Sequence, residues 1–249
     1  MRLDMFTDYK PAKGYDEYFS ATSQPRSALR PLLSSLGQLG IEEINRNHAA
    51  AGMLLKRLGA TFRLNGSGEQ GGERILPFDP LPRLIRAGEW QELEKGLIQR
   101  LEAIDCFLAD VYSDQKILND GVIPRADVVS SHGWRPQMAG FKPPLDRWCH
   151  ISGLDLIRDG KGTWRVLEDN LRCPSGVAYF LENRRVMKRM FPSLFSGPTV
   201  QPIDDYPSHL LQTLRELAPW TDTPSVVLLT PGVFNSAYFE HSYLAQQMG

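Results

Sequence analysis

Residues 155–172 constrain the fold of this chain more than any other stretch, because they read as a β-hairpin with a polar face. Two short strand-like runs flank a Gly-rich turn, and the second run contains Glu168, Asp169 and Asn170. Residues i and i+2 of a strand point to the same face. Glu168 and Asn170 therefore converge on one face, while Asp169 points away from it.

Asp155, on the first strand, can add a third oxygen donor to this face. It does so if the hairpin pairs Asp155 with Glu168 or with Val166. Three oxygen donors on a rigid hairpin suit Mg²⁺, which takes a few protein oxygens and leaves other positions to water and phosphate. Arg172 follows directly and could meet the phosphate. Periodicity alone fits an ordinary hairpin with polar residues on its solvent face equally well.

The composition narrows the class of protein without naming a function. The chain has 249 residues, of which 42% are hydrophobic and 23% charged, as in soluble globular proteins. A net charge of −1 gives no overall electrostatic attraction to nucleic acid or to an anionic membrane. No apolar run is long enough to span a bilayer. The start lacks the apolar core of a signal peptide. Three widely spaced cysteines support neither a disulfide framework nor a zinc cluster. These features predict a cytoplasmic protein.

The sequence suggests three parts. Residues 1–60 combine an irregular lead segment, extending to about Ser35, with a helix that carries an apolar stripe. Residues 61–195 contain the hairpin and a following helix that ends at Met190, for which Ser175 is a fair N-cap. Residues 196–249 comprise a Pro-rich linker, a helix, and a strand–turn–helix unit.

A long helix is expected over residues 87–118. Its apolar residues recur at intervals of three and four, which predicts a buried stripe. Its charged residues, among them Glu89 and Arg100, mostly fall elsewhere and read as a solvated face.

The Gly-rich run at residues 65–72 resembles a phosphate-binding loop at first sight. It lacks the Gly-Lys-Ser/Thr ending of a P-loop. Because strand-like residues flank it on both sides, we expect a hairpin connection.

The apolar run at residues 225–232 predicts a strand of the buried parallel type, followed by a turn and a helix. In a strand–turn–helix unit of this type, the helix normally leads to a second strand that pairs in parallel with the first. None follows before Gly249, so we expect the fold to be incomplete at its C-terminal end.

Several polar residues have no spacing that selects a role for them. Arg135 and Arg147 could reach a substrate anion, or could pack on the neighbouring tryptophans. Glu240 and His241 on the last helix could touch a substrate.

The motif Leu-Glu-Asp-Asn-Leu-Arg at residues 167–172, followed by Pro-Ser-Gly at 174–176, resembles the bacterial circularly permuted ATP-grasp proteins of type 2. The likeness covers nearly the whole chain. More distantly, the chain is similar to the synthetase domain of glutathionylspermidine synthetase. Further segments that carry the resemblance are residues 77–83, 96–100, 107–112, 142–145, 153–158 and 229–245.

This resemblance implies an α/β (α+β-like) ATP-grasp fold with ATP and Mg²⁺ as cofactors. In the similar enzyme an Asp on one strand and a Glu-x-Asn on the next hold Mg²⁺ on the ATP phosphates, and Asp155, Glu168 and Asn170 match that pattern. The resemblance also implies phosphate or acyl-phosphate contacts for Arg172 and Arg184. A backbone turn with Ser175 and Gly176 would lie close to the bound substrate or cofactor.

The implied activity is that of an ATP-dependent carboxylate–amine ligase. Such enzymes activate a small-molecule or peptide carboxylate as an acyl phosphate, which an amine then attacks. In permuted members much of the adenine-contacting part comes late in the chain, and we expect it beyond Gly249. Two alternatives stay open: a non-catalytic binding or scaffold protein, and a Mg²⁺-dependent phosphohydrolase.

Overall fold

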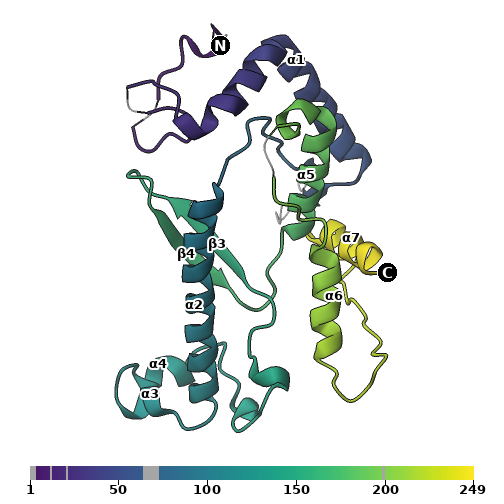
Figure 1. Cartoon of the computed structure of the whole chain (residues 1–249). Coiled ribbons are helices and arrows are strands. Elements are labelled where there is room, and N and C mark those ends of the chain that lie inside the picture. The colour runs from purple at the N-terminus through teal and green to yellow at the C-terminus, as the bar shows by residue number, and fades with distance from the viewer. Residues whose placement is uncertain (1–3, 12, 21, 64–72, 198–199) are drawn as a thin grey trace.

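The computed structural model describes residues 4–11, 13–20, 22–63, 73–197 and 200–249 (Figure 1). Helices and two small sheets give a mixed α/β composition, which agrees with the predicted class. The helices are α1 (Arg30–Arg57), α2 (Ala87–Val111), α3 (Lys116–Asn119), α4 (Arg125–Val129), α5 (Val177–Met190), α6 (Tyr206–Glu216) and α7 (Tyr238–Met248). Short 3₁₀ turns are η1 (Asp4–Phe6), η2 (Ser27–Leu29), η3 (Pro136–Met138), η4 (Pro144–Asp146) and η5 (Pro192–Phe195). The strands are β1 (Thr61–Arg63), β2 (Glu73–Ile75), β3 (Gly153–Arg158) and β4 (Trp164–Asn170).

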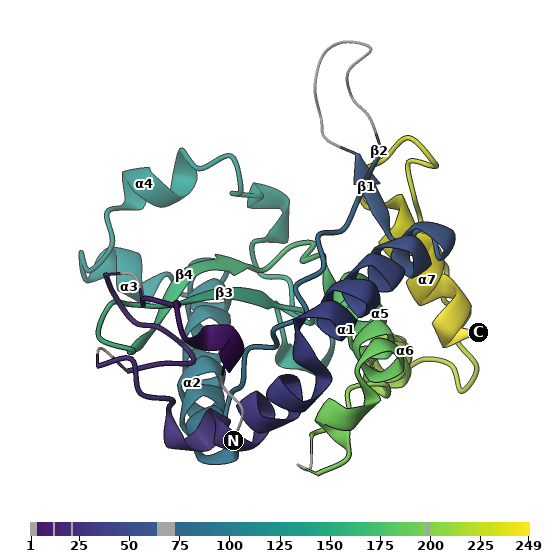
Figure 2. The same cartoon turned by 90° about the horizontal axis from the view of Figure 1, so that it is seen from above.

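The main apolar core lies between α1 and α5, which pack against each other near one end of the molecule (Figures 1 and 2). Among the described residues, neither α2 nor the β3–β4 hairpin contributes to this cluster. Its members are Phe19, Leu29, Leu32, Leu33, Leu36, Ile44, Ala51, Leu55, Ala60, Phe78, Val186, Met187, Phe191 and Leu194.

Helix α1 begins six residues earlier than the sequence predicts. Pro31 stands in its first turn, where the missing N–H of proline needs no partner. Gly40 interrupts the helix with a left-handed φ of 75°, a conformation that glycine adopts without strain. The lead segment is therefore shorter than expected.

Helix α2 ends at Val111, whereas the sequence predicts a helix that continues to residue 118. Asp110 explains the break, because its carboxylate accepts hydrogen bonds from the N–H groups of Lys116 and Ile117 at the start of α3 (both 2.9 Å). Gln115 between the two helices has a left-handed φ of 55°. The chain reverses there and a separate helix follows. The predicted stripe of α2 is mostly half-buried, and Trp90 at its start is exposed.

Both sheets are two-stranded and antiparallel. Strand β1 pairs with β2 so that Thr61 lies opposite Ile75, as expected for a hairpin. The Gly-rich run predicted to connect these strands, residues 65–72, lies outside the described residues.

The predicted strand at residues 225–232 does not form. This segment makes no ladder with another strand, and the side chains of Val227 and Leu229 are 80% and 90% exposed. The prediction was wrong because a parallel strand needs a neighbouring strand, and the described part of the chain places none beside it.

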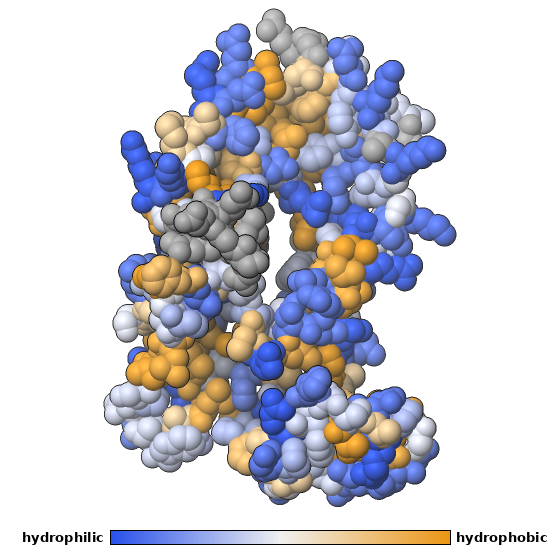
Figure 3. All heavy atoms as spheres, turned by 180° about the vertical axis from the view of Figure 1, so that it is seen from behind, coloured by the Kyte–Doolittle hydropathy of each residue, from blue (hydrophilic) through white to orange (hydrophobic). Residues whose placement is uncertain are grey.

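The helical core and the hairpin lie on two sides of the molecule. Seen from above, α2, β3 and β4 lie on one side and α5, α6 and α7 on the other (Figure 2). The space-filling view from behind shows a gap between the two sides (Figure 3). None of the described helices combines the length and the apolarity that a membrane crossing requires.

Candidate metal centre

The β3–β4 hairpin has two unlike faces. On one face, Leu154 lies opposite Asp169 and Arg158 lies opposite Trp164. These four residues are less exposed than their neighbours on the other face, and polar residues of α2 contact this face. The other face is open, and the side chains of β3 and β4 on it are exposed.

The three predicted ligands lie together on the open face. Asp155 is paired directly with Glu168, which confirms one of the two registers considered for the hairpin. Asn170 donates a hydrogen bond from Nδ2 to Oε1 of Glu168 at 3.1 Å. The hydrogen bond between Asp155 and Glu168 raises the pKa of Asp155, and desolvation and the negative charge of Glu168 act in the same direction.

A β-bulge separates the two ends of β4. The register shifts between Asp155 and Leu156, because Asp155 pairs with Glu168 while Leu156 pairs with Val166. Leu167 is the extra residue, and it is exposed like its neighbour Glu168. The bulge therefore turns Glu168 to the open face, although Val166 two residues earlier faces α2.

This donor set fits a hard cation that takes only a few of its oxygen ligands from the protein. Two carboxylates and one amide oxygen are the ligand types that Mg²⁺ takes from proteins. The residues described here contain no group of three or more His, Cys, Asp or Glu side chains that could hold a metal ion. A cation on this face would therefore use the amide and take its remaining ligands from water or phosphate.

Helix α2 holds the back of the hairpin through an ion pair. Arg100 donates from Nε and Nη2 to the two carboxylate oxygens of Asp169, at 2.7 and 2.6 Å. These hydrogen bonds lower the pKa of Asp169 and raise that of Arg100. Arg100 is exposed, as predicted, with 46% of its side chain accessible. The sequence did not show that its guanidinium binds Asp169 of β4.

A second polar cluster lies at the turn end of the hairpin. The guanidinium of Arg158 is 2.8 Å from Glu89 on α2 and 3.3 Å from Glu17 in the lead segment. It stacks between the rings of Tyr15 and Trp164, at 4.9 and 4.3 Å from their centroids. Glu89 also accepts a hydrogen bond from the indole Nε1 of Trp164. Glu89 is thus a residue that the sequence wrongly assigned to a solvated face.

Asp105 of α2 anchors the loop that leads into the hairpin. Its buried carboxylate accepts hydrogen bonds from the N–H groups of Trp148 and Cys149 and pairs with Arg147 at 3.2 Å. Arg135 donates to the backbone carbonyls of His132 and Trp134. Both loop arginines therefore have partners within the chain. Sequence reasoning missed Asp105, although its position four residues after Leu101 and three before Leu108 places it on the apolar face of the helix.

The start of α5 is capped by Glu240, for which the sequence suggested a substrate contact and not a structural role. Glu240, buried on α7, accepts hydrogen bonds from the N–H groups of Gly176 and Ala178 at 2.7 and 2.9 Å. Gly176, with a φ of 111°, is the N-cap residue, and no side chain caps the helix from that position. The prediction of Ser175 as N-cap was wrong. Ser175 itself is exposed.

The two predicted arginines lie in different surroundings. Arg172 is exposed, and in the described part of the chain it forms neither a hydrogen bond nor an ion pair. Arg184 lies in the middle of α5 and donates to the backbone carbonyl of Gln201 at 3.1 Å. Only Arg172 directly follows the strand that carries the candidate ligands.

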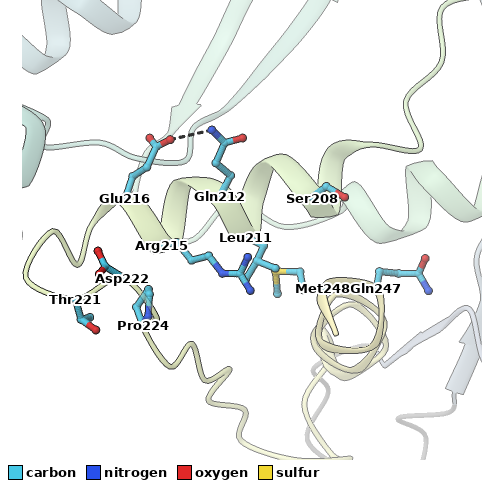
Figure 4. Close-up of a pocket in the computed structure, with 10 residues that line it drawn as sticks. All are labelled: Ser208, Leu211, Gln212, Arg215, Glu216, Thr221, Asp222, Pro224, Gln247 and Met248. Atoms are coloured by element: carbon cyan, nitrogen blue, oxygen red, sulfur yellow. Dashed lines mark hydrogen bonds between the residues drawn. The ribbon is translucent and has the colours of Figure 1, made fainter.

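A cavity lies elsewhere, between α6, the loop after it and the end of α7 (Figure 4). It measures about 550 Å³, and none of the predicted site residues lines it. Its polar wall includes Gln212, which donates to Glu216 at 2.9 Å.

Comparison with known proteins connects these features to a family. A family model described as circularly permuted ATP-grasp type 2 matches residues 82–249. An uncharacterized protein of Synechocystis is 53% identical over 97% of this chain and 50% of its own length. An uncharacterized protein of Mycobacterium tuberculosis is 48% identical over 96% of the chain and 42% of its own length. A protein of Frankia alni, provisionally named glutamate–cysteine ligase 2-3, is 38% identical over 97% of the chain and 28% of its length. The chain thus spans half or less of these relatives.

Proposed function

Because this chain belongs to the circularly permuted ATP-grasp type 2 family, we propose that it carries the metal-binding part of an ATP-dependent carboxylate–amine ligase. The observation that carries this proposal is the pairing of Asp155 with Glu168, with Asn170 beside them on the open face of the hairpin. The provisional ligase name of the Frankia relative supports the same class of reaction.

In the proposed reaction, the γ-phosphoryl group of ATP passes to a carboxylate oxygen of the acid substrate, giving an acyl phosphate and ADP. The amine then attacks the acyl carbon, and an amide forms with release of phosphate and a proton. Mg²⁺, when bound, would neutralise charge on the phosphates. Asp155, Glu168 and Asn170 would hold it. The guanidinium of Arg172, which has no partner among the described residues, would contact a phosphate oxygen.

The other predicted phosphate contacts have weaker support. The N–H of Gly176 already donates to Glu240, and Arg184 already donates to the carbonyl of Gln201. Either group would have to exchange its partner before it could bind phosphate. This observation favours, as a second candidate, a non-catalytic relative that binds metal without turning over ATP.

A metal titration tests the proposal. Mn²⁺ can replace Mg²⁺ and its binding can be followed by electron paramagnetic resonance. We expect Asp155→Asn and Glu168→Gln each to weaken binding at least tenfold, because each removes a charged ligand. Glu102→Gln, an exposed carboxylate on α2, is the matched control and should leave the affinity unchanged. Equal affinity in all four proteins would contradict the metal site.

ATP turnover separates the remaining candidates. With the acid and amine substrates present, formation of ADP that depends on the amine supports the ligase. Phosphate release without any amine indicates a phosphohydrolase. Metal binding with no ATP turnover in a full-length relative supports the non-catalytic alternative.

A further inference from the structure

Asp169 lies between two of the proposed metal ligands but points the other way. Glu168 and Asn170 face the open side of the hairpin, while Asp169 faces α2. Its side chain is only 16% exposed and forms a two-point contact with Arg100. The backbone that carries the ligands is therefore fixed from behind by one ion pair.

The geometry of this ion pair restrains rotation as well as distance. Two parallel N–H···O bonds between a planar guanidinium and a carboxylate fix the orientation of the carboxylate, which a single contact would not. Arg100 lies in the middle of α2, a helix of 25 residues. A regular helix is a rigid support compared with a two-stranded sheet.

The outer end of β4 needs such a restraint because the bulge weakens the ladder there. Beyond Leu167 only Glu168, Asp169 and Asn170 still pair with β3. A bulge locally disrupts the ladder and increases its twist. Without Arg100, this short end could rotate, and Glu168 and Asn170 would lose their common direction toward Asp155.

We propose that Arg100 is a positioning residue for the metal centre, acting through Asp169 on the two ligands beside it. This inference rests on the proposed function of Asp155, Glu168 and Asn170. Residues that orient metal ligands from behind change metal affinity by 10- to 100-fold when they are mutated. A loss of that size is expected here although Arg100 never touches the metal.

The hairpin provides its own control at the opposite end. Glu89, also on α2, contacts Arg158 and Trp164 near the turn, at the far end of β3 and β4 from Asp155 and Glu168. Glu89→Gln should lower the melting temperature through the loss of that ion pair. It should leave Mn²⁺ affinity unchanged, because the ligands keep their support from Arg100.

The test measures Mn²⁺ affinity and melting temperature on the whole chain for the wild type, Arg100→Ala, Arg100→Lys, Asp169→Asn and Glu89→Gln. We expect a 10- to 100-fold loss of Mn²⁺ affinity for Arg100→Ala and Asp169→Asn. We expect an intermediate loss for Arg100→Lys, because lysine keeps the positive charge but cannot form the two parallel hydrogen bonds of the guanidinium. If Arg100→Ala does not fold, the affinities of Arg100→Lys and Asp169→Asn still test the proposal.

Three results would overturn the proposal, and they are distinguishable. If Glu168→Gln abolishes Mn²⁺ binding while the Arg100 and Asp169 variants bind like the wild type, the positioning role is wrong and the metal site stands. If Glu168→Gln leaves binding intact, the proposed metal site itself is wrong and Arg100 has nothing to position. A loss of affinity in Glu89→Gln equal to that in Arg100→Ala would also overturn it, since any loosening of the hairpin would then suffice.

Discussion

The helical core and the hairpin are held together by different forces. Helices α1 and α5 bury large aliphatic and aromatic side chains, among them Leu33 and Phe191, which are inaccessible to solvent. The hairpin is bound to α2 and the lead segment through Arg158 and Arg100, each paired with carboxylates. The stability of the helical core depends on the removal of apolar area from water, whereas the attachment of the hairpin depends on directional charge pairs.

This difference fits what each side has to do. Apolar packing has little directional preference and tolerates small shifts, so it suits a core. Hydrogen-bonded ion pairs fix angles, so they suit a hairpin that must present three polar side chains toward one point. We therefore expect substitutions on the two sides to differ in size and in their response to salt and pH.

The largest effect is expected in the helical core. Leu33→Ala should lower the free energy of unfolding by about 2–5 kcal/mol, because the change removes buried methyl groups and leaves a cavity. Urea denaturation measures this loss. Leu167→Ala is the matched control: this leucine is 65% exposed, and its truncation should change stability by less than about 0.5 kcal/mol. Similar losses in both variants would mean that the core does not dominate stability.

The next largest effect is expected at Arg158. Its side chain is only 8% exposed, so Arg158→Met should cost about 2–3 kcal/mol, somewhat less than the loss of a partner in a fully buried pair. Amide hydrogen exchange should speed up in β3 and β4 while α1 and α5 stay protected. Arg165→Met, which removes an exposed ion pair at the turn, should have little effect. If exchange in α1 and α5 speeds up as much as in β3 and β4, the helical core and the hairpin unfold together.

A smaller loss is expected for Glu240→Gln. Glu240 caps the first turn of α5 from α7, and helix capping groups typically contribute about 1 kcal/mol. The glutamine keeps an acceptor oxygen but loses the charge that favours a helix N-terminus. Thermal unfolding of the variant is compared with that of Glu216→Gln, an exposed residue of α6. Equal melting temperatures would show that the buried cap contributes nothing beyond an ordinary surface glutamate.

The smallest effect on stability is expected for Asp169→Asn, and it should depend on conditions. Because Arg100 lowers the pKa of Asp169 in the folded protein, the contribution of this carboxylate is complete above its unfolded pKa of about 3.9. It disappears as the pH falls through the lower pKa of the folded state. The difference between wild type and variant should also shrink in high salt, since the pair is partly exposed. A difference that persists below both pKa values would contradict the ion pair as its cause.

Local patterns predicted the hairpin well. Alternation in the strand separates Asp169 from Glu168 and Asn170. The pairing of Asp155 with Glu168 was one of two registers that the sequence left open. The pattern could not show the bulge at Leu167, because the run from Trp164 to Asn170 looks like an ordinary strand.

Contacts between distant elements were the part that the sequence could not provide. Glu89 and Arg100 were grouped with the solvated charges, although helical spacing places them beside Leu93 and Leu97 of the apolar stripe. Only the position of the hairpin against α2 shows which partners they bind. Glu240 lies 64 residues from the N–H that it caps, and no local spacing links the two. The apolar composition of residues 225–232 favoured a strand, but a strand forms only where a second segment pairs with it, and the described residues provide none.

The bulge at Leu167 has a consequence for comparing relatives. The bulge reverses the alternation of β4. Before it the even-numbered residues Trp164 and Val166 face α2, and after it the odd-numbered Asp169 does. A relative lacking one residue at Leu167 would keep Glu168 and Asp169 on their present faces, since the regular alternation would then run unbroken. Loss of Asp169 would instead place Asn170 directly after Glu168 and turn its side chain inward. The effect of an insertion or deletion in this strand thus depends on its position, which decides whether Glu168 and the residue two positions later still face the open side.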